Sequence, residues 1–222
     1  MKRTFISLLT LFFGVSLFAQ INAEQFALDV SKAEAANTEK LKDFIWKRYS
    51  TATVDGEEKA TLITEFKFDE NGELKANQVG GESSVKKKPG IRGRIQENAI
   101  ENNVDYVSEA LELALAYSFM SKGQLLDFFE KGTITAKDNT IQVTAGGVLM
   151  DGDKLTVVID NATKLFISKK FSCMLDEDPI DGELKYGTFN SGISHGTKTI
   201  LNLPGKNAVI NAENKDYSQR IE

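Results

Sequence analysis

The chain has almost none of the residues that build metal centres and covalent cross-links. Its 222 residues include one cysteine, Cys173, and one histidine, His195. A lone cysteine cannot form an internal disulfide, and zinc or copper sites need several nitrogen or sulfur ligands. We therefore predict no disulfide, no metal centre of this kind and no cofactor, and we expect burial of apolar surface to stabilise the fold. Cys173 falls on the apolar side of an alternating segment, which favours a buried, inert thiol.

Positive charge is also in short supply. The chain has 27 lysines and arginines against 32 aspartates and glutamates, which gives a net charge of −5 at pH 7. Proteins that bind nucleic acid present a basic face to the phosphates, so this acidic total argues against nucleic acid as the main partner. Oxygen ligands for calcium are present at 151–153 and 176–183, but neither segment follows an EF-hand loop. We interpret both as solvated, acidic turns between strands.

Long apolar runs are absent except at the start of the chain. There, a basic tripeptide precedes an apolar run at 5–18, and small residues follow at Ala19 and Ala23. This order predicts a secretory signal peptide over residues 1–23, with cleavage after Ala23 favoured over cleavage after Ala19. The run is shorter than the roughly 20 residues that a membrane-spanning helix needs. Because no cysteine for lipid attachment lies near either site, we expect a periplasmic or secreted protein with a single domain over 24–222.

The first part of the mature chain alternates between two periodicities. Apolar residues recur at helical spacing over 24–43, which predicts a helix. From Phe44 to Val54 the period changes to two, as in a strand, and Asp55-Gly56 then gives a tight turn signal. Two further strands are expected over 58–68 and 73–79. The sequence therefore opens with one helix and three strands.

A long helical pattern occupies the middle of the chain. It runs over 96–119, and its second half is apolar nearly all round. A helix without a polar face has to be enclosed on most sides, so we expect it to lie inside something concave. A shorter helix is predicted over 121–131, with Ser121 as its N-cap and Gly132 as its end.

The rest of the chain, from residue 133 on, shows the pattern of a series of short strands. Turn signals separate them, including one at Asp181-Gly182. The predicted strands are 133–136, 140–145, 154–160, 164–175, 183–190, 197–203 and 207–213. Because the connections are too short for helical crossovers, we expect antiparallel neighbours. The predicted fold class is α+β: one large, curved antiparallel sheet of eight to ten strands, an incomplete barrel, that encloses the helices.

This order of elements, carried by Phe26 to Val79, Gln96 to Lys131 and Thr133 to Tyr217, resembles the lipoprotein-carrier (LolA/LolB-like) superfamily. The resemblance spans most of the mature chain and depends on no short motif. It implies an incomplete barrel whose helices cover a cavity that shelters acyl chains. None of the superfamily's functional residues is assigned to a position in this sequence.

One motif points to a hydrolase and its context rejects it. Residues 192–196 match the G-x-S-x-G pattern of a serine nucleophile. That motif needs a helix after the serine and a base elsewhere in the chain, whereas a strand is predicted here after Ser194. The only histidine, His195, is adjacent to this serine and would point to the opposite face of an extended segment. We therefore predict no enzymatic activity.

Aromatic and large apolar residues offer two interpretations. The chain has 14 phenylalanines, and aromatic side chains dominate protein cores in general, so core packing is one interpretation. The other is that some of them line an apolar ligand cavity between sheet and helices. The candidates for that cavity are Trp46, Phe66, Phe68, Leu111, Leu115 and Phe119.

A single loop before the long helix concentrates positive charge. It carries Lys86, Lys87, Lys88, Arg92 and Arg94 within nine residues. Such a cluster attracts anionic lipid headgroups by about 1 kcal/mol per charge, and it would also attract an acidic protein. We consider it a candidate docking site for a membrane or partner, with a solvated loop that has no partner as the alternative.

These observations predict a non-enzymatic binding protein of the bacterial envelope. It would hold a lipid, a lipoprotein acyl chain or another apolar ligand between sheet and helices. The alternative is a structural or interaction protein of the envelope with a filled interior, and an exported hydrolase comes third. An apolar cleft of roughly several hundred Å³ would favour the first interpretation.

Overall fold

The computed structural model describes residues 22–83, 106–175, 177–189 and 192–220. Its helices are α1 (Ala23–Leu41), a central helix that is described over 106–118, and α3 (Lys122–Lys131). Its strands are β1 (Phe44–Val54), β2 (Glu57–Phe68), β3 (Leu74–Ser83), β4 (Thr133–Lys137), β5 (Thr140–Gly146), β6 (Lys154–Asp160), β7 (Phe166–Leu175), β8 (Asp178–Phe189), β9 (Ile193–Leu203) and β10 (Ala208–Gln219). A short 3-10 helix, Pro204–Lys206, connects β9 to β10.

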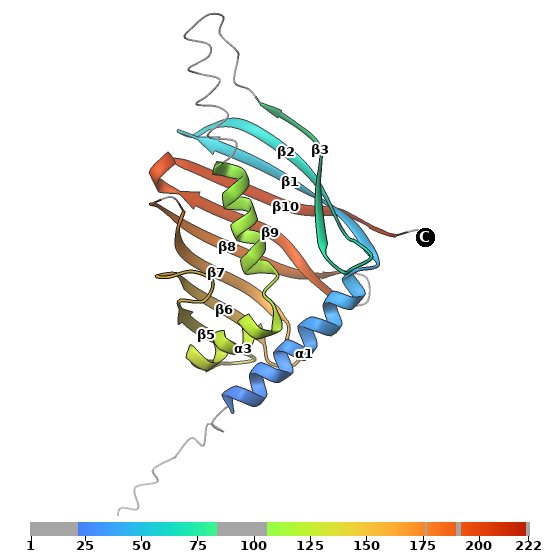
Figure 1. Ribbon diagram of the computed structural model, residues 1–222, viewed down its shortest axis with the longest axis vertical. Helices are drawn as coiled ribbons and strands as arrows, with labels where there is room; N and C mark the ends of the chain where they lie inside the picture. Colours follow the sequence, from blue (N-terminus) through green and yellow to red (C-terminus); the bar gives the residue numbers. More distant parts are fainter. Residues whose placement is uncertain (1–21, 84–105, 176, 190–191, 221–222) are drawn as a thin grey trace, which may run out of the picture.

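All ten described strands belong to one sheet. Their order is β3-β2-β1-β10-β9-β8-β7-β6-β5-β4, and every neighbouring pair is antiparallel. Only the β1–β10 pair joins distant parts of the chain, so the first three strands extend the sheet beyond the last one. The sheet is curved, and the three helices cover the same face of it (Figure 1). The predicted fold class, a curved antiparallel sheet that encloses helices, is confirmed.

The N-terminal elements begin and end where the sequence signals predict. The side chain of Asn22 accepts a hydrogen bond from the backbone N–H of Gln25 and caps α1. At the β1–β2 hairpin, Asp55 and Gly56 have φ values of 53° and 79°. Positive φ at both central residues is the backbone geometry of a type I′ turn, which Asp-Gly favours. The strand before it alternates buried and partly buried side chains, as the period of two predicts.

Helix α3 also follows its sequence signals. Ser121 and Gln124 form a capping box, in which each side chain bonds the backbone of the other residue. Gly132 ends the helix, as predicted. The buried side chains of α3, Leu125, Phe128 and Phe129, face the sheet and hold the helix against it.

One part of the concave side is completely filled, and we call it the filled half. It consists of the inward faces of β5, β6 and β7 together with the central helix and α3. Val143, Val157 and Ile159 have no exposed surface there. Tyr117 of the central helix stacks on Phe171 of β7 at a centroid distance of 4.0 Å. These residues belong to the main hydrophobic core of the protein.

A buried carboxylate fixes the loop beside the filled half. Asp153 accepts hydrogen bonds from the backbone N–H groups of Val148, Leu149 and Met150 and from the hydroxyl of Tyr117. Burial by itself would raise the pKa of Asp153, but these donors outweigh it and the pKa lies below its ordinary value.

In the described part of the chain, no group of three His, Cys, Asp or Glu side chains could hold a metal ion.

The predicted turn at Asp181-Gly182 is wrong. Both residues lie inside β8, and the connection that precedes it contains Glu177, with a φ of 69°. Gly182 is needed within the strand because the ring of Phe171 packs against it: a Cβ at Gly182 would lie 2.1 Å from a carbon of that ring. The glycine therefore marks a close side-chain approach and not a turn.

The prediction for the lone thiol is confirmed. Cys173 lies on the inward face of β7, is 6% exposed and forms no disulfide. Burial raises its pKa to about 11, so the thiol stays protonated and unreactive at neutral pH.

None of the helices in the described part of the chain has the length and apolar content needed to cross a membrane.

Candidate functional site

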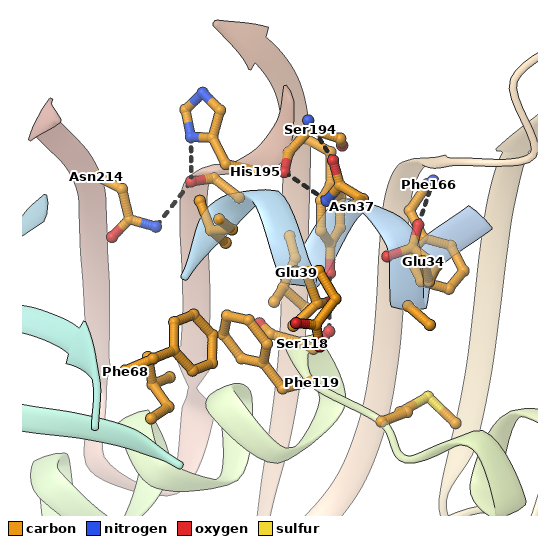
Figure 2. A pocket seen from close by; sticks show the side chains of 18 of the residues that line it. Glu34, Asn37, Glu39, Phe68, Ser118, Phe119, Phe166, Ser194, His195 and Asn214 are labelled. Atoms are coloured by element: carbon orange, nitrogen blue, oxygen red, sulfur yellow. Dashed lines mark hydrogen bonds between the residues drawn. The ribbon is translucent and has the colours of Figure 1, made fainter. Parts of the chain in front are cut away.

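A cavity of about 390 Å³ lies between α1 and the sheet. Side chains from α1, β1, β8, β9 and β10 form its walls, and the 118–122 link between the central helix and α3 closes one side (Figure 2). We call this region the open half of the concave side. Its volume falls within the range of ordinary small-molecule sites, which is roughly 300 to 1,000 Å³.

A row of stacked aromatic rings crosses the strands at this cavity. Trp46 of β1 stacks between Phe66 of β2 and Tyr217 of β10, with centroid distances of 5.8 Å on each side. Tyr217 in turn contacts Phe189 of β8 and the ring of His195 of β9. Cross-strand aromatic pairs of this kind stabilise a sheet and give it a rigid, flat apolar surface.

Two polar residues of α1 attach the helix to the cavity wall. Asn37 donates to the carbonyl of Ser194 at 2.8 Å and accepts from the backbone N–H of Ser194 at 2.7 Å. One turn earlier, Glu34 accepts from the backbone N–H of Phe166 at 3.2 Å. Figure 2 shows both contacts beside the hollow. The wall formed by α1 is therefore fixed in place by hydrogen bonds and does not depend on apolar packing alone.

A buried lysine lies behind the cavity wall on the side of the filled half. The ammonium of Lys169 donates to the carbonyls of Tyr117 and Ser118 at the end of the central helix, at 2.9 and 3.0 Å. It also lies 3.9 Å from the centroid of the Phe166 ring. Burial lowers its pKa to about 8, while the nearby carboxylate of Glu34 acts in the opposite direction. Two helix carbonyls therefore bind this cation, which stabilises the end of the helix.

A buried arginine lies in the wall on the opposite side. Arg48 points inward from β1 two residues after Trp46 and is 5% exposed. Its Nε donates to Oδ1 of Asn214 at 3.1 Å, and Nδ2 of Asn214 donates to the carbonyl of Gly196 at 2.7 Å. The guanidinium lies 4.7 Å from the centroid of the Phe66 ring. Burial lowers its pKa to about 10, so it remains charged at neutral pH.

The structure gives the G-x-S-x-G segment a role in the wall. Ser194 and His195 lie inside β9, which continues as a strand to Leu203. The Nδ1 of His195 lies 2.6 Å from the hydroxyl of Tyr217, and burial lowers the pKa of the imidazole. A nucleophile elbow needs a helix at this point, so residues 192–196 do not form one.

Three of the six predicted cavity residues line the cavity. These are Trp46, Phe68 and Phe119. Phe68 and Phe119 meet edge to face at 6.3 Å; Phe68 is buried, whereas Phe119 is 41% exposed and lies at the mouth. The predicted residues in the loop, Lys86, Lys87, Lys88, Arg92 and Arg94, lie outside the described residues.

The other three predicted residues pack into the protein interior. Phe66 lies behind the cavity wall, in contact with Trp46. Leu111 belongs to the main core, and Leu115 packs against the aromatic cluster of β1 and β2. Their periodicity identifies them as buried but does not distinguish a core position from a cavity wall.

Sequence reasoning missed the polar residues of the site. Glu34, Asn37 and Asn214 had no distinguishing signal, because each forms a hydrogen bond with a residue more than a hundred positions away. Arg48 did have one: it shares the inward parity of Phe44 and Trp46 in an alternating strand. A charged residue at an inward position is unusual enough to indicate a site.

Comparisons with known proteins found structural neighbours only. No protein-family model and no curated protein sequence matches the chain. The chain is similar to a DUF1329 family protein from Desulfovibrio piger, with 9% identity, a TM-score of 0.42 and coverage of 90% of this chain and 92% of the other. It is similar to a LolA superfamily protein from Nitrosomonas europaea, with 8% identity, a TM-score of 0.38 and coverage of 88% and 94%.

A third solved structure is similar over the same extent. It is an outer membrane lipoprotein-sorting domain from Vibrio parahaemolyticus, with 11% identity, a TM-score of 0.46 and coverage of 90% and 94%. These likenesses concern the fold.

Proposed function

We propose that this chain is an exported, non-enzymatic binding protein of the bacterial envelope that holds an amphiphilic ligand, such as a lipid or a lipoprotein acyl chain, in the open half. The observation that carries this proposal is the cavity of about 390 Å³ between α1 and the sheet. A structural protein with a filled interior would have no such space. The proposal assigns the filled half to stability and the open half to binding.

The composition of the wall favours a ligand with a long apolar part. The stacked rings of Trp46 and Tyr217 form part of the wall, and Phe68 packs edge to face against Phe119 at the mouth. Each methylene that leaves water for such a surface contributes about 0.8 kcal/mol. Binding would therefore be driven by enclosure of an alkyl chain, and no covalent step is involved.

Export is the second part of the proposal, and α1 suggests where the signal peptide ends. Cleavage after Ala23 would remove the Asn22 cap and leave a positively charged amine at the start of the helix, which opposes its dipole. Cleavage after Ala19 would keep the cap. The cap therefore favours Ala19 over the site favoured from sequence alone. The intact mass of the exported protein distinguishes the two products.

Native mass spectrometry of protein purified from its own envelope tests the binding function. We expect a population with the added mass of a lipid. Thr199 lines the cavity and is 5% exposed, so Thr199→Phe should fill the space and remove that population. Asn202→Phe places the same ring on the exposed face of the same strand and should leave it unchanged. A wild-type protein without added mass under gentle conditions would contradict the proposal.

A further inference from the structure

Arg48 is a buried cation with most of its hydrogen-bonding capacity unused. A guanidinium has five N–H donors and no acceptor. The Nε–H of Arg48 is bound to Asn214, but no described residue accepts a hydrogen bond from the other four N–H groups. The side chain is 5% exposed and lines the cavity. A charge that is withdrawn from water in this way normally has a partner.

No carboxylate in the described part of the chain forms an ion pair with Arg48. The groups that favour its charged form are the phenols of Tyr217 and Tyr186, which are neutral at pH 7 because burial raises their pKa values. The carboxylate of Glu34 lines the same cavity but interacts with Lys169. Among the described residues that line the cavity, Arg48 is therefore a buried cation without a carboxylate partner.

The surroundings of Arg48 fix the orientation of its free donors. Asn214 holds the Nε edge of the guanidinium and is itself held by the carbonyl of Gly196. The ring of Phe66, 4.7 Å away, covers the guanidinium. Because the planar guanidinium is held at its Nε edge, its two terminal nitrogens are free to bind side by side. This is the geometry that binds two oxygens of one anion.

We infer that Arg48 is the headgroup site of the cavity and binds the oxyanion of an acidic amphiphile, with the alkyl chain along the aromatic rings toward Phe119. This inference rests on the proposed function and narrows its ligand class from apolar to anionic. The oxyanion is a carboxylate in a fatty acid or a phosphate in a phospholipid, and both match the same fork.

Binding of three ligands with the same chain tests the inference. The ligands are hexadecanoate, monohexadecyl phosphate and hexadecanol, each measured by calorimetry against the full mature chain. We expect the anions to bind about 10- to 100-fold more tightly than the alcohol, as a charge-assisted hydrogen-bonded pair requires. The tighter of the two anions identifies the headgroup class.

Substitutions then assign the preference to one residue. Arg48→Met keeps the apolar stem and should abolish the preference for anions while hexadecanol still binds. Arg48→Lys keeps the positive charge but lacks the planar guanidinium, so this variant should retain only part of the preference for anions. The matched control is Lys47→Met, which removes a charge from the same strand on the side that faces away from the cavity.

The outcomes separate the inference from the proposed function. If the wild type binds the alcohol as tightly as the anions, or if Arg48→Met keeps the preference, the headgroup assignment is wrong and the carrier function stands. If the wild type binds none of the three ligands, both fail. The comparison among ligands on the wild type needs no variant, so a variant that does not fold leaves the test valid.

Discussion

The two halves of the concave side contain buried cations in opposite situations. Lys169, beside the filled half, has two carbonyls as partners and holds the end of the central helix. Arg48, in the open half, has one amide partner and faces a cavity. A protein tolerates a buried charge when the fold supplies hydrogen-bonding partners for it. On the proposal above, the buried cation that keeps most of its donors unused, Arg48, marks the binding region.

The halves also differ in what occupies the inward positions of their strands. In the filled half these positions hold branched aliphatic residues such as Val157 and Ile159, which interdigitate with the helices above. In the open half they hold flat rings and polar side chains, including Trp46 and Thr199. Flat rings stack on each other across strands and do not fill the space above them. The hollow thus follows from the choice of side chains on a continuous sheet.

The largest effect should come from truncation in the filled half. Leu155 of β6 has no exposed surface, so Leu155→Ala leaves a cavity as well as removing apolar contacts. We expect a loss of about 3 kcal/mol in the free energy of unfolding, measured by urea denaturation. A loss below about 1 kcal/mol would show that this half is not tightly packed.

The Asp153 network should give a smaller effect with a defined pH dependence. Asp153→Ala removes four hydrogen bonds to a carboxylate and leaves Tyr117 without its partner, and we expect a loss of about 2 kcal/mol at pH 7. Because the folded-state pKa of Asp153 is depressed, its contribution is complete above the unfolded value of about 3.9 and disappears as pH falls through the folded value.

Denaturation at several pH values checks this prediction. The difference between wild type and Asp153→Ala should shrink as the pH is lowered below about 4. The control is Asp151→Ala in the same loop, where the side chain is exposed and the change should stay within about 0.5 kcal/mol. A difference that is independent of pH would rule out the carboxylate as the source of the stabilisation.

A substitution at the mouth of the open half should have little effect on stability but should weaken ligand binding. Phe119 is 41% exposed, so Phe119→Ala should lower the free energy of unfolding by less than about 1 kcal/mol. It should also weaken hexadecanoate binding several-fold, because the ring covers the alkyl chain at the mouth. If wild type and variant bind hexadecanoate equally well, the alkyl chain does not lie against Phe119.

Local patterns were enough to predict most of the fold. The helix before Phe44, the Asp55-Gly56 hairpin and the capping signals at Ser121 and Gly132 act over a few residues, and the structure has each of them. The error at Gly182 has a different origin. Its neighbour Phe171 lies in another strand, and glycine can mark a turn or a close approach with the same local signal.

The site could be predicted only in part for the same reason. Aromatic content indicated Trp46, Phe68 and Phe119, which line the cavity. The pairing of Arg48 with Asn214 joins residues 166 positions apart through the β1–β10 contact. Periodicity shows which face a side chain takes but not which distant strand lies next to it.

The most direct test of the account uses the single tryptophan of the chain. Trp46 lies in the cavity wall two residues from Arg48 on the same face of β1, a spacing of about 7 Å. Hexadecanoate brominated close to its carboxyl group should quench the fluorescence of Trp46 in a saturable manner, and Thr199→Phe should abolish the effect. Fluorescence that is unchanged in the wild type, or quenched equally in both proteins, would contradict a ligand site in the open half.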